Sequence, residues 1–197
     1  MLSYLAAALP PEVSGDARLL AVQCALRATR SGRLQIPVAL LRAMRMARRP
    51  GPWRELEETG WLIRLSTSHL PAERSRVAAQ LLDATVLTQA PGRMDRAQAA
   101  HTALHLISRR ALRGLSASEQ LAGLALATHL SPDGLQGVIE AERLGRVCAV
   151  SPESLAVTLD RLVTAQVVGS WSYDLGSEDI TWSLGPVLVD WEGRQGL

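Results

Sequence analysis

Arginine is the residue type whose spacing in this sequence points most directly to a chemistry. The stretch LLRAMRMARRPGPWRELEE, residues 40–58, carries five arginines: Arg42, Arg45, Arg48, Arg49 and Arg54. Arg42 and Arg45 are three positions apart and Arg45 and Arg49 are four, so each pair shares one face of a helix. Guanidinium groups gathered in this way can neutralise several phosphates of a nucleic acid. The alternative is a solvated helix face whose arginines pair with Glu55, Glu57 and Glu58.

Other chemistry-bearing residues do not form a catalytic pattern. His101 and His105 have the i, i+4 spacing of two metal ligands, but no Cys, Asp or Glu nearby completes a ligand set. The sequence has no phosphate-binding loop, no dinucleotide fingerprint and no G-x-S-x-G nucleophile motif. We therefore expect a protein that is not an enzyme and that uses neither a metal nor a cofactor.

The elements that must position side chains are clearest in the second half of the chain. SEQLAGLALATHL, from Ser118, has the periodicity of a buried helix. A turn is expected at 131–134, and the segment 135–147 continues with helical periodicity. Ser151 is a good N-cap ahead of Pro152, and a helix follows it. Residues 167–184 alternate and turn once, as a β-hairpin does.

The segment LALATHLSPDGLQGVIEAERLGRVCAVSPESLAVTLDRLVTAQVV resembles the winged helix-turn-helix domains of plasmid replication initiators and bacterial transcription regulators. The resemblance places the second helix at about 138–147, a tight turn at 149–151 and the recognition helix at about 152–165. It is best over residues 118–184 and implies double-stranded DNA as the partner. Winged helices also serve as protein-binding modules, so the resemblance is more specific for fold than for function.

The implied recognition helix has an unusual composition for a DNA reader. In the resembled family its outer face reaches base edges. Here the outer face is expected to carry Glu153, Ser154, Thr158, Asp160 and Arg161, with Ser151 at the turn before it. Arg161 is the only basic residue among them, and the hairpin adds Asp174, Glu178 and Asp179. Residues 150–184 could therefore contact DNA, through Ser151, Ser154, Thr158 and Arg161, or dock a partner protein.

A degenerate second copy of this unit is expected in the first half. Residues 15–46 align with 116–147 at an offset of 101, which pairs Leu20 with Leu121 and Met46 with Val147. A short third helix is expected at roughly 52–59, with Gly60 at its end. Residues 55–66 then resemble the end of a recognition helix entering a wing, and no second wing strand is evident after Ser66.

The sequence thus predicts a mainly α fold with small β-wings, made of tandem winged helix-turn-helix units joined by a helical linker. The N-terminal unit would span 1–70 with a preceding helix at 2–9, the linker 71–115, and the C-terminal domain 116–197. Helices are expected at 72–87 and 94–114, and either these (72–87 or 94–112) or helix 2–9 would form a homodimer. Their small residues allow close packing.

Charge and composition limit the classes of function that this sequence can have. Residues 1–100 carry a net charge of +6 and residues 101–197 a net charge of −4, so one half attracts a polyanion better than the other. With no membrane-spanning run and only Cys24 and Cys148, both expected to be buried thiols, we expect a cytoplasmic location. The leading hypothesis is a bacterial DNA-binding protein, either a transcription regulator or a plasmid or chromosome maintenance factor. The alternative is a non-catalytic scaffold whose acidic second unit docks a partner protein.

Overall fold

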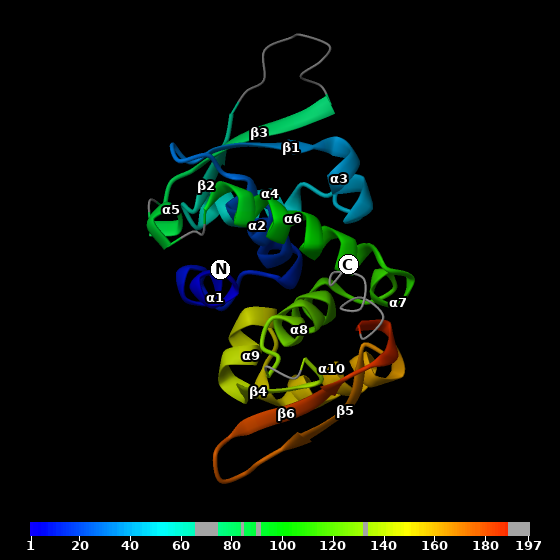
Figure 1. Cartoon of the computed structure of the whole chain (residues 1–197). Coiled ribbons are helices and arrows are strands. Elements are labelled where there is room, and N and C mark those ends of the chain that lie inside the picture. Colours follow the sequence, from blue (N-terminus) through cyan, green and yellow to red (C-terminus); the bar gives the residue numbers. More distant parts are fainter. Residues whose placement is uncertain (66–74, 84, 90–91, 132–133, 189–197) are drawn as a thin grey trace. The chain divides into compact units, whose positions relative to one another are not determined.

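The chain folds into two compact units, Met1–Ser108 and Arg109–Leu197. The computed structural model describes residues 1–65, 75–83, 85–89, 92–131 and 134–188 (Figure 1). Each unit combines helices with one three-stranded antiparallel sheet, so the fold is mainly α with small β elements, as predicted. Among the described helices, none is both long and apolar enough to span a bilayer.

The first unit contains six described helices and three strands. The helices are α1 (Leu2–Ala8), α2 (Gly15–Arg27), α3 (Val38–Ala43), α4 (Gly51–Glu58), α5 (Thr85–Gln89) and α6 (Arg93–Ser108). The strands are β1 (Arg33–Pro37), β2 (Leu62–Arg64) and β3 (Arg76–Leu81), in the sheet order β1-β3-β2.

Helix α2 is the centre of the first unit. It begins where the Ser14 hydroxyl accepts a hydrogen bond from the Ala17 amide, which satisfies one of the free amides of the first turn. Almost every residue of α2 is buried, because α1, α4, α6 and β1 all pack on it. Fully buried side chains of this core include Leu19, Leu20, Ile36, Met46, Leu56, Leu62 and Leu106.

The second unit contains four described helices and three strands. The helices are α7 (Arg110–Arg113), α8 (Ala117–Ala127), α9 (Ala141–Cys148) and α10 (Pro152–Thr164). The strands are β4 (Gln136–Glu140), β5 (Val168–Tyr173) and β6 (Asp179–Leu184), in the order β4-β6-β5. Its core includes Leu112, Leu121, Leu126, Leu144 and Leu159. The helix expected at 152–165 and the hairpin that follows it are both present.

The two units share one order of elements, which is helix, strand, helix, helix, strand, strand. It begins at α2 in the first unit and at α8 in the second. In both sheets the strand that comes last in the chain lies between the other two. Leu34 pairs with Ala79 in the first sheet, and Gly137 pairs with Trp182 in the second, so both members of the pair are displaced by 103 positions. The predicted offset of 101 is therefore two residues short along the strands.

The turns that follow the second and third helices also correspond. Arg45 (φ 59°) and Ala149 (φ 54°) are left-handed after α3 and α9, and Gly60 (φ 67°) and Gln166 (φ 59°) are left-handed after α4 and α10. In all four turns the next amide donates to the carbonyl five residues back, which ends the preceding helix. Because the turn after α3 corresponds to the turn after α9, Met46 corresponds to Val150. The alignment expected from the sequence pairs Met46 with Val147 instead.

Two expected helices are wrong in part, because the helix expected at about 138–147 begins only at Ala141, as α9, and a strand lies within 72–87. Residues 76–81, inside the helix expected at 72–87, form β3, the central strand of the first sheet and the strand that was missing after Ser66. Residues 136–140, inside the helical stretch expected at 135–147, form β4, in which Gly137 and Ile139 alternate inward. In both segments, pairing with strands that are distant in the sequence outweighs the local preference for a helix.

The segment 71–115 is also not a separate helical linker. Its strand β3 belongs to the sheet of the first unit, and α6 packs on α2. The helix expected at 94–114 ends at Ser108, because Arg109 is extended (φ −60°, ψ 146°) before α7. Residues 66–74, which include the end of the stretch expected to enter a wing, and the Pro132-Asp133 part of the predicted turn lie outside the described residues. Cys24 and Cys148 are buried free thiols, as predicted.

Candidate nucleic-acid interface

Four exposed arginines surround the junction of α3 and α4. Arg42 lies in the last turn of α3, Arg45 in the left-handed turn after it, Arg48 just before α4 and Arg54 within α4. We call these four residues the arginine corner. Within the part of the chain that the structure describes, none of the four guanidinium groups makes an ion pair or a hydrogen bond.

Arg49, the fifth predicted residue, is held differently. Its guanidinium forms an ion pair with Asp16, in the first turn of α2, at 2.7 Å. The pair ties the junction of α3 and α4 to the central helix. Arg49 is thus less available to a phosphate than its four neighbours, although about half of its side chain is exposed.

The glutamates of α4 do not neutralise the arginine corner. Glu57 binds Arg64 of β2 through two side-chain hydrogen bonds of 2.7 and 2.9 Å, which hold the pKa of the Glu57 carboxyl below its usual value. Glu55 accepts hydrogen bonds from the amide and the hydroxyl of Ser14. Glu58 is exposed and makes no ion pair with a described residue. The alternative in which these three glutamates pair with the corner arginines is therefore wrong.

Helix α10 presents a different surface from the one expected of it. Glu153, Val157 and Asp160 form one exposed stripe, four and then three positions apart. Ser154 is also exposed, but Thr158 is only 7% exposed and its hydroxyl donates to the Ser154 carbonyl at 3.0 Å. The placement of Thr158 on the outer face is thus wrong. Its position, three residues from Leu155 and four from Leu162, belongs to the buried side.

Ser151 occupies the N-cap position of α10, as predicted, without a side-chain capping bond. Its hydroxyl faces the Ser154 hydroxyl at 3.2 Å instead. A hydrogen bond from Ser151 also lowers the pKa of Glu153, so the Glu153 carboxyl stays ionised at neutral pH. A negative charge therefore lies beside Ser151 and Ser154, at the N-terminus of α10.

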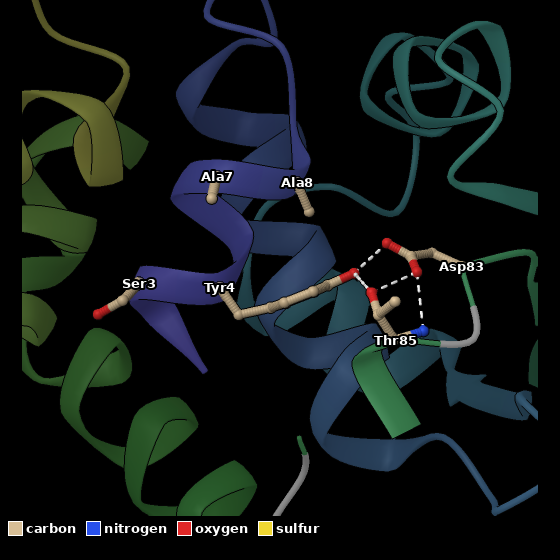
Figure 2. A pocket seen from close by; sticks show the side chains of 6 residues that line it. All are labelled: Ser3, Tyr4, Ala7, Ala8, Asp83 and Thr85. Atoms are coloured by element: carbon tan, nitrogen blue, oxygen red, sulfur yellow. Dashed lines mark hydrogen bonds between the residues drawn. The ribbon is translucent and has the colours of Figure 1, made fainter. Parts of the chain in front are cut away.

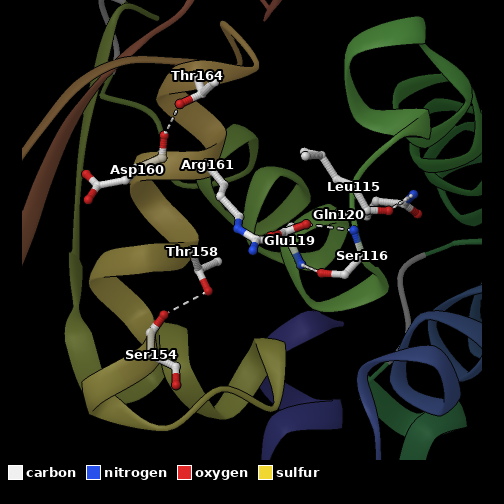
Figure 3. Close-up of polar contacts among 9 residues, drawn as sticks. All are labelled: Leu115, Ser116, Glu119, Gln120, Ser154, Thr158, Asp160, Arg161 and Thr164. Atoms are coloured by element: carbon white, nitrogen blue, oxygen red, sulfur yellow. Dashed lines mark hydrogen bonds and ion pairs between the residues drawn. The ribbon is translucent and has the colours of Figure 1, made fainter.

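Arg161, the only arginine of α10, supports the fold of its own unit. Its guanidinium contacts the Glu119 carboxylate at 3.0 Å (Figure 3). Glu119 is 5% exposed, and it also completes the capping box of α8 by accepting from the Ser116 amide at 2.7 Å. Sequence reasoning missed this pair because its partners are 42 positions apart, although the S-x-x-E spacing of Ser116 and Glu119 signals the cap itself.

The hairpin after α10 extends the acidic character of this surface. The Trp171 indole of β5 donates to the Asp160 carboxylate at 2.9 Å, which joins the strand to the exposed stripe of α10. Tyr173 lies two residues further on the same side of β5 and is exposed. In the turn, Asp174 accepts from the Gly176 amide at 2.7 Å, and Leu175 is 86% exposed. The β5–β6 hairpin thus combines carboxylates with exposed apolar groups.

A second polar cluster of the first unit lies in a shallow hollow beside α1, lined in part by Ala7 and Ala8 (Figure 2). The Tyr4 hydroxyl donates to Asp83, and Asp83 also accepts from the Thr85 amide at 2.8 Å, at the start of α5. Burial and the bond to Asp83 raise the pKa of Tyr4. Burial opposes ionisation of Asp83, but hydrogen bonds from Thr85 and Tyr4 outweigh it and lower the Asp83 pKa. These bonds attach α1 to the start of α5.

The described residues hold no group of three or more His, Cys, Asp or Glu side chains that could bind a metal. His101 and His105 stack on the exposed side of α6, with ring centroids 6.3 Å apart. Of the nine predicted contact residues, the structure leaves Arg42, Arg45, Arg48 and Arg54 exposed in α3, in α4 and between them, whereas Arg49, Thr158 and Arg161 contact other residues of the protein. No family model, no curated protein and no solved structure matches this chain.

Proposed function

We propose that both units are winged helix-turn-helix domains, with α4 and α10 as third helices and β2–β3 and β5–β6 as wings. The support is the shared order helix, strand, helix, helix, strand, strand, with the last strand in the middle of each sheet. Left-handed turns at corresponding places after the second and third helices add to it.

The protein binds double-stranded DNA through the arginine corner of the first unit, in a regulator of transcription or a plasmid or chromosome maintenance factor. The observation that carries this proposal is the set of four exposed guanidinium groups at the junction of α3 and α4, with no ion-pair partner among the described residues. An unpaired arginine binds a phosphate without first breaking a protein contact. Because these contacts address the backbone, they give affinity with little sequence preference.

A second candidate function is a protein scaffold, and the surface of α10 favours it. Its exposed stripe carries two carboxylates and a valine, its one arginine is engaged by Glu119, and the adjacent wing is acidic. Carboxylates that face a phosphate backbone repel it. The second unit therefore serves as a protein-binding module in either proposal, and the two differ in whether the first unit binds DNA.

Fluorescence polarisation with a labelled random-sequence duplex separates the two candidates. If the four corner arginines each contact one phosphate, raising the salt from about 50 to 200 mM weakens binding roughly a hundredfold. Replacing Arg48 and Arg54 by glutamate abolishes most of the affinity, whereas the matched reversal of Arg30 and Arg93, which are also exposed, leaves most of it. Absence of binding by the wild-type protein at 50 mM salt would leave the scaffold as the function.

A further inference from the structure

The exposed stripe of α10 and the adjacent side of the β5–β6 hairpin form one surface, which we call the acidic face. It consists of Glu153, Val157, Asp160, Trp171 and Tyr173, together with the turn at 174–178. The bond between Trp171 and Asp160 shows that helix and strand meet there. Val157, Tyr173 and Leu175 are among the large apolar side chains that remain exposed. A surface that combines exposed apolar groups with carboxylates suits a protein partner that carries both apolar and cationic groups.

The chemistry of the acidic face fits arginine side chains. Carboxylates accept the planar guanidinium group, often with two hydrogen bonds. The faces of tryptophan and tyrosine rings attract the same group, and the apolar stem of arginine packs on valine and leucine. Lysine satisfies fewer of these contacts, since its charge is compact and strongly hydrated. The sequence contains no lysine, so all 21 of its Lys and Arg residues are arginines.

The arginine corner of the first unit is the complementary surface. Arg42, Arg45, Arg48 and Arg54 are exposed and have no ion-pair partner among the described residues. The first half of the chain is net positive and the second half is net negative, so the first half of one copy attracts the second half of another copy. Self-association through the helix expected at 94–112 has less support, because the small-residue side of α6, with Ala100 and Ala103, is already buried and α6 packs on α2.

We propose that the acidic face of one copy binds the arginine corner of a second copy, and that DNA competes with this contact. The competition rests on the proposed DNA-binding function, whereas the self-association does not. Because the contact joins two different surfaces, a pair of copies retains one free arginine corner and one free acidic face, unless the two copies dock reciprocally. The contact depends largely on charge, so it is weak and salt-dependent, with a dissociation constant on the order of micromolar.

Sedimentation velocity of two variants, alone and mixed, tests the contact. The corner variant carries Arg42→Glu, Arg48→Glu and Arg54→Glu, and the stripe variant carries Glu153→Arg and Glu178→Arg. Each is monomeric alone, because each lacks one of the two complementary surfaces. The equimolar mixture forms a heterodimer, because the intact acidic face of the corner variant meets the intact arginine corner of the stripe variant. Heterodimer formation also shows that both variants are folded.

The wild-type protein associates reversibly at tens of micromolar in low salt, and about 0.5 M salt or excess random duplex returns it to monomer. Matched controls, Arg30→Glu with Arg93→Glu and Arg113→Glu, and Glu12→Arg with Glu142→Arg, associate as the wild type does. A monomeric wild-type protein at this concentration would overturn the proposal, as would self-association by either variant alone or a mixture that stays monomeric.

The two proposals fail separately. DNA binding is measured at nanomolar protein, where copies do not associate, and self-association is measured without DNA. A protein that binds duplex but sediments as a monomer refutes only the contact between copies. A protein that associates as described but binds no duplex refutes only the DNA proposal, and with it the competition.

Discussion

Arg161 illustrates how one residue can suggest DNA binding in the sequence and support the fold in the structure. It is the only arginine on α10, the helix that the resemblance assigns to base contacts, yet it lies 3.0 Å from Glu119, which is buried at the N-terminus of α8. A buried carboxylate that loses its cationic partner keeps its desolvation cost. Removing Arg161 therefore affects the stability of the second unit more than DNA affinity.

We expect Arg161→Ala to lower the unfolding free energy of the second unit by about 1–2 kcal/mol, because Glu119 loses a charge-assisted hydrogen bond while keeping its cap. Urea denaturation followed by circular dichroism measures this change. The control is Arg146→Ala, since Arg146 pairs with Glu142 on an exposed helix surface, and it should cost less than about 0.5 kcal/mol. Equal costs for the two variants would mean that the pair of Arg161 and Glu119 has no special role.

Glu57 and Arg64 give a pH-dependent prediction for the first unit. Hydrogen bonds from Arg64 hold the pKa of Glu57 in the folded protein below its ordinary value of 4.5. The stabilisation is therefore complete above pH 4.5 and is lost as the pH falls through the lower, folded-state pKa. Glu57→Gln should lower stability by less than about 1 kcal/mol at pH 7, because the pair is partly exposed, and the difference from the wild type should shrink toward pH 3.

Denaturation midpoints measured between pH 7 and pH 3 check this expectation. Glu58→Gln is the control, because Glu58 is exposed on the same helix and forms no ion pair with a described residue. A difference between wild type and Glu57→Gln that grows on acidification would contradict the assigned pKa shift.

At the level of elements, the sequence predicts those whose evidence is local. Ser151 and Pro152 predict the start of α10, and the alternation in 167–184 predicts the β5–β6 hairpin. It misses β3 and β4, whose partners are distant in the chain. In β3, Ala78 and Ala79 favour a helix by propensity, but the strand is paired on both sides. In β4, Ile139 suits a helical period with Leu135 and Leu144 as well as a strand.

For the candidate site as well, the sequence predicts the features that are local and misses those that depend on distant residues. The sequence locates the arginine corner because its members lie within thirteen positions, from Arg42 to Arg54. It does not reveal which arginines are free, since that depends on partners such as Asp16 for Arg49. The same limit applies to α10, where Glu119 and Trp171 determine what Arg161 and Asp160 can contact.

The corresponding sheet positions of the two units exchange large and small residues. Leu34 faces Ala79 in the first sheet, whereas Gly137 faces Trp182 in the second. A Cβ atom on Gly137 would lie 2.2 Å from the Trp182 ring and 2.4 Å from the His129 carbonyl oxygen. Each pair thus fills its space with one large and one small side chain, in opposite order.

We expect Gly137→Leu alone to destabilise the second unit by about 3 kcal/mol or more through overpacking, and Trp182→Ala alone by about 3–5 kcal/mol. The double variant, which introduces the residues of the first unit, should lose at least about 1 kcal/mol less than the two single losses together. Urea denaturation followed by circular dichroism provides the cycle. Gly114→Leu, at a helix end with open space around it, is the neutral control. Additive losses would show that the two positions are not equivalent across the units.

At the level of the whole molecule, charge separates the two units more clearly than fold does. The first hundred residues carry +6 and the remainder −4, and the units share one order of elements. In the first unit, the exposed arginine corner has no ion-pair partners among the described residues. In the second unit, α10, the helix equivalent to α4, carries exposed carboxylates, and its one arginine is paired with Glu119. We infer a division of labour in which the first unit binds the polyanion and the second binds protein.

The salt dependence of duplex affinity tests this division most directly, because its log–log slope reports the number of phosphates neutralised. With four contacts from the arginine corner, the wild-type slope should be about −3.6, and the corner variant should lose about 2.7 of it. Arg161→Ala and the stripe variant should keep the wild-type slope. If Arg161→Ala flattens the slope while the corner variant keeps it, the second unit contacts the DNA backbone and the account is contradicted.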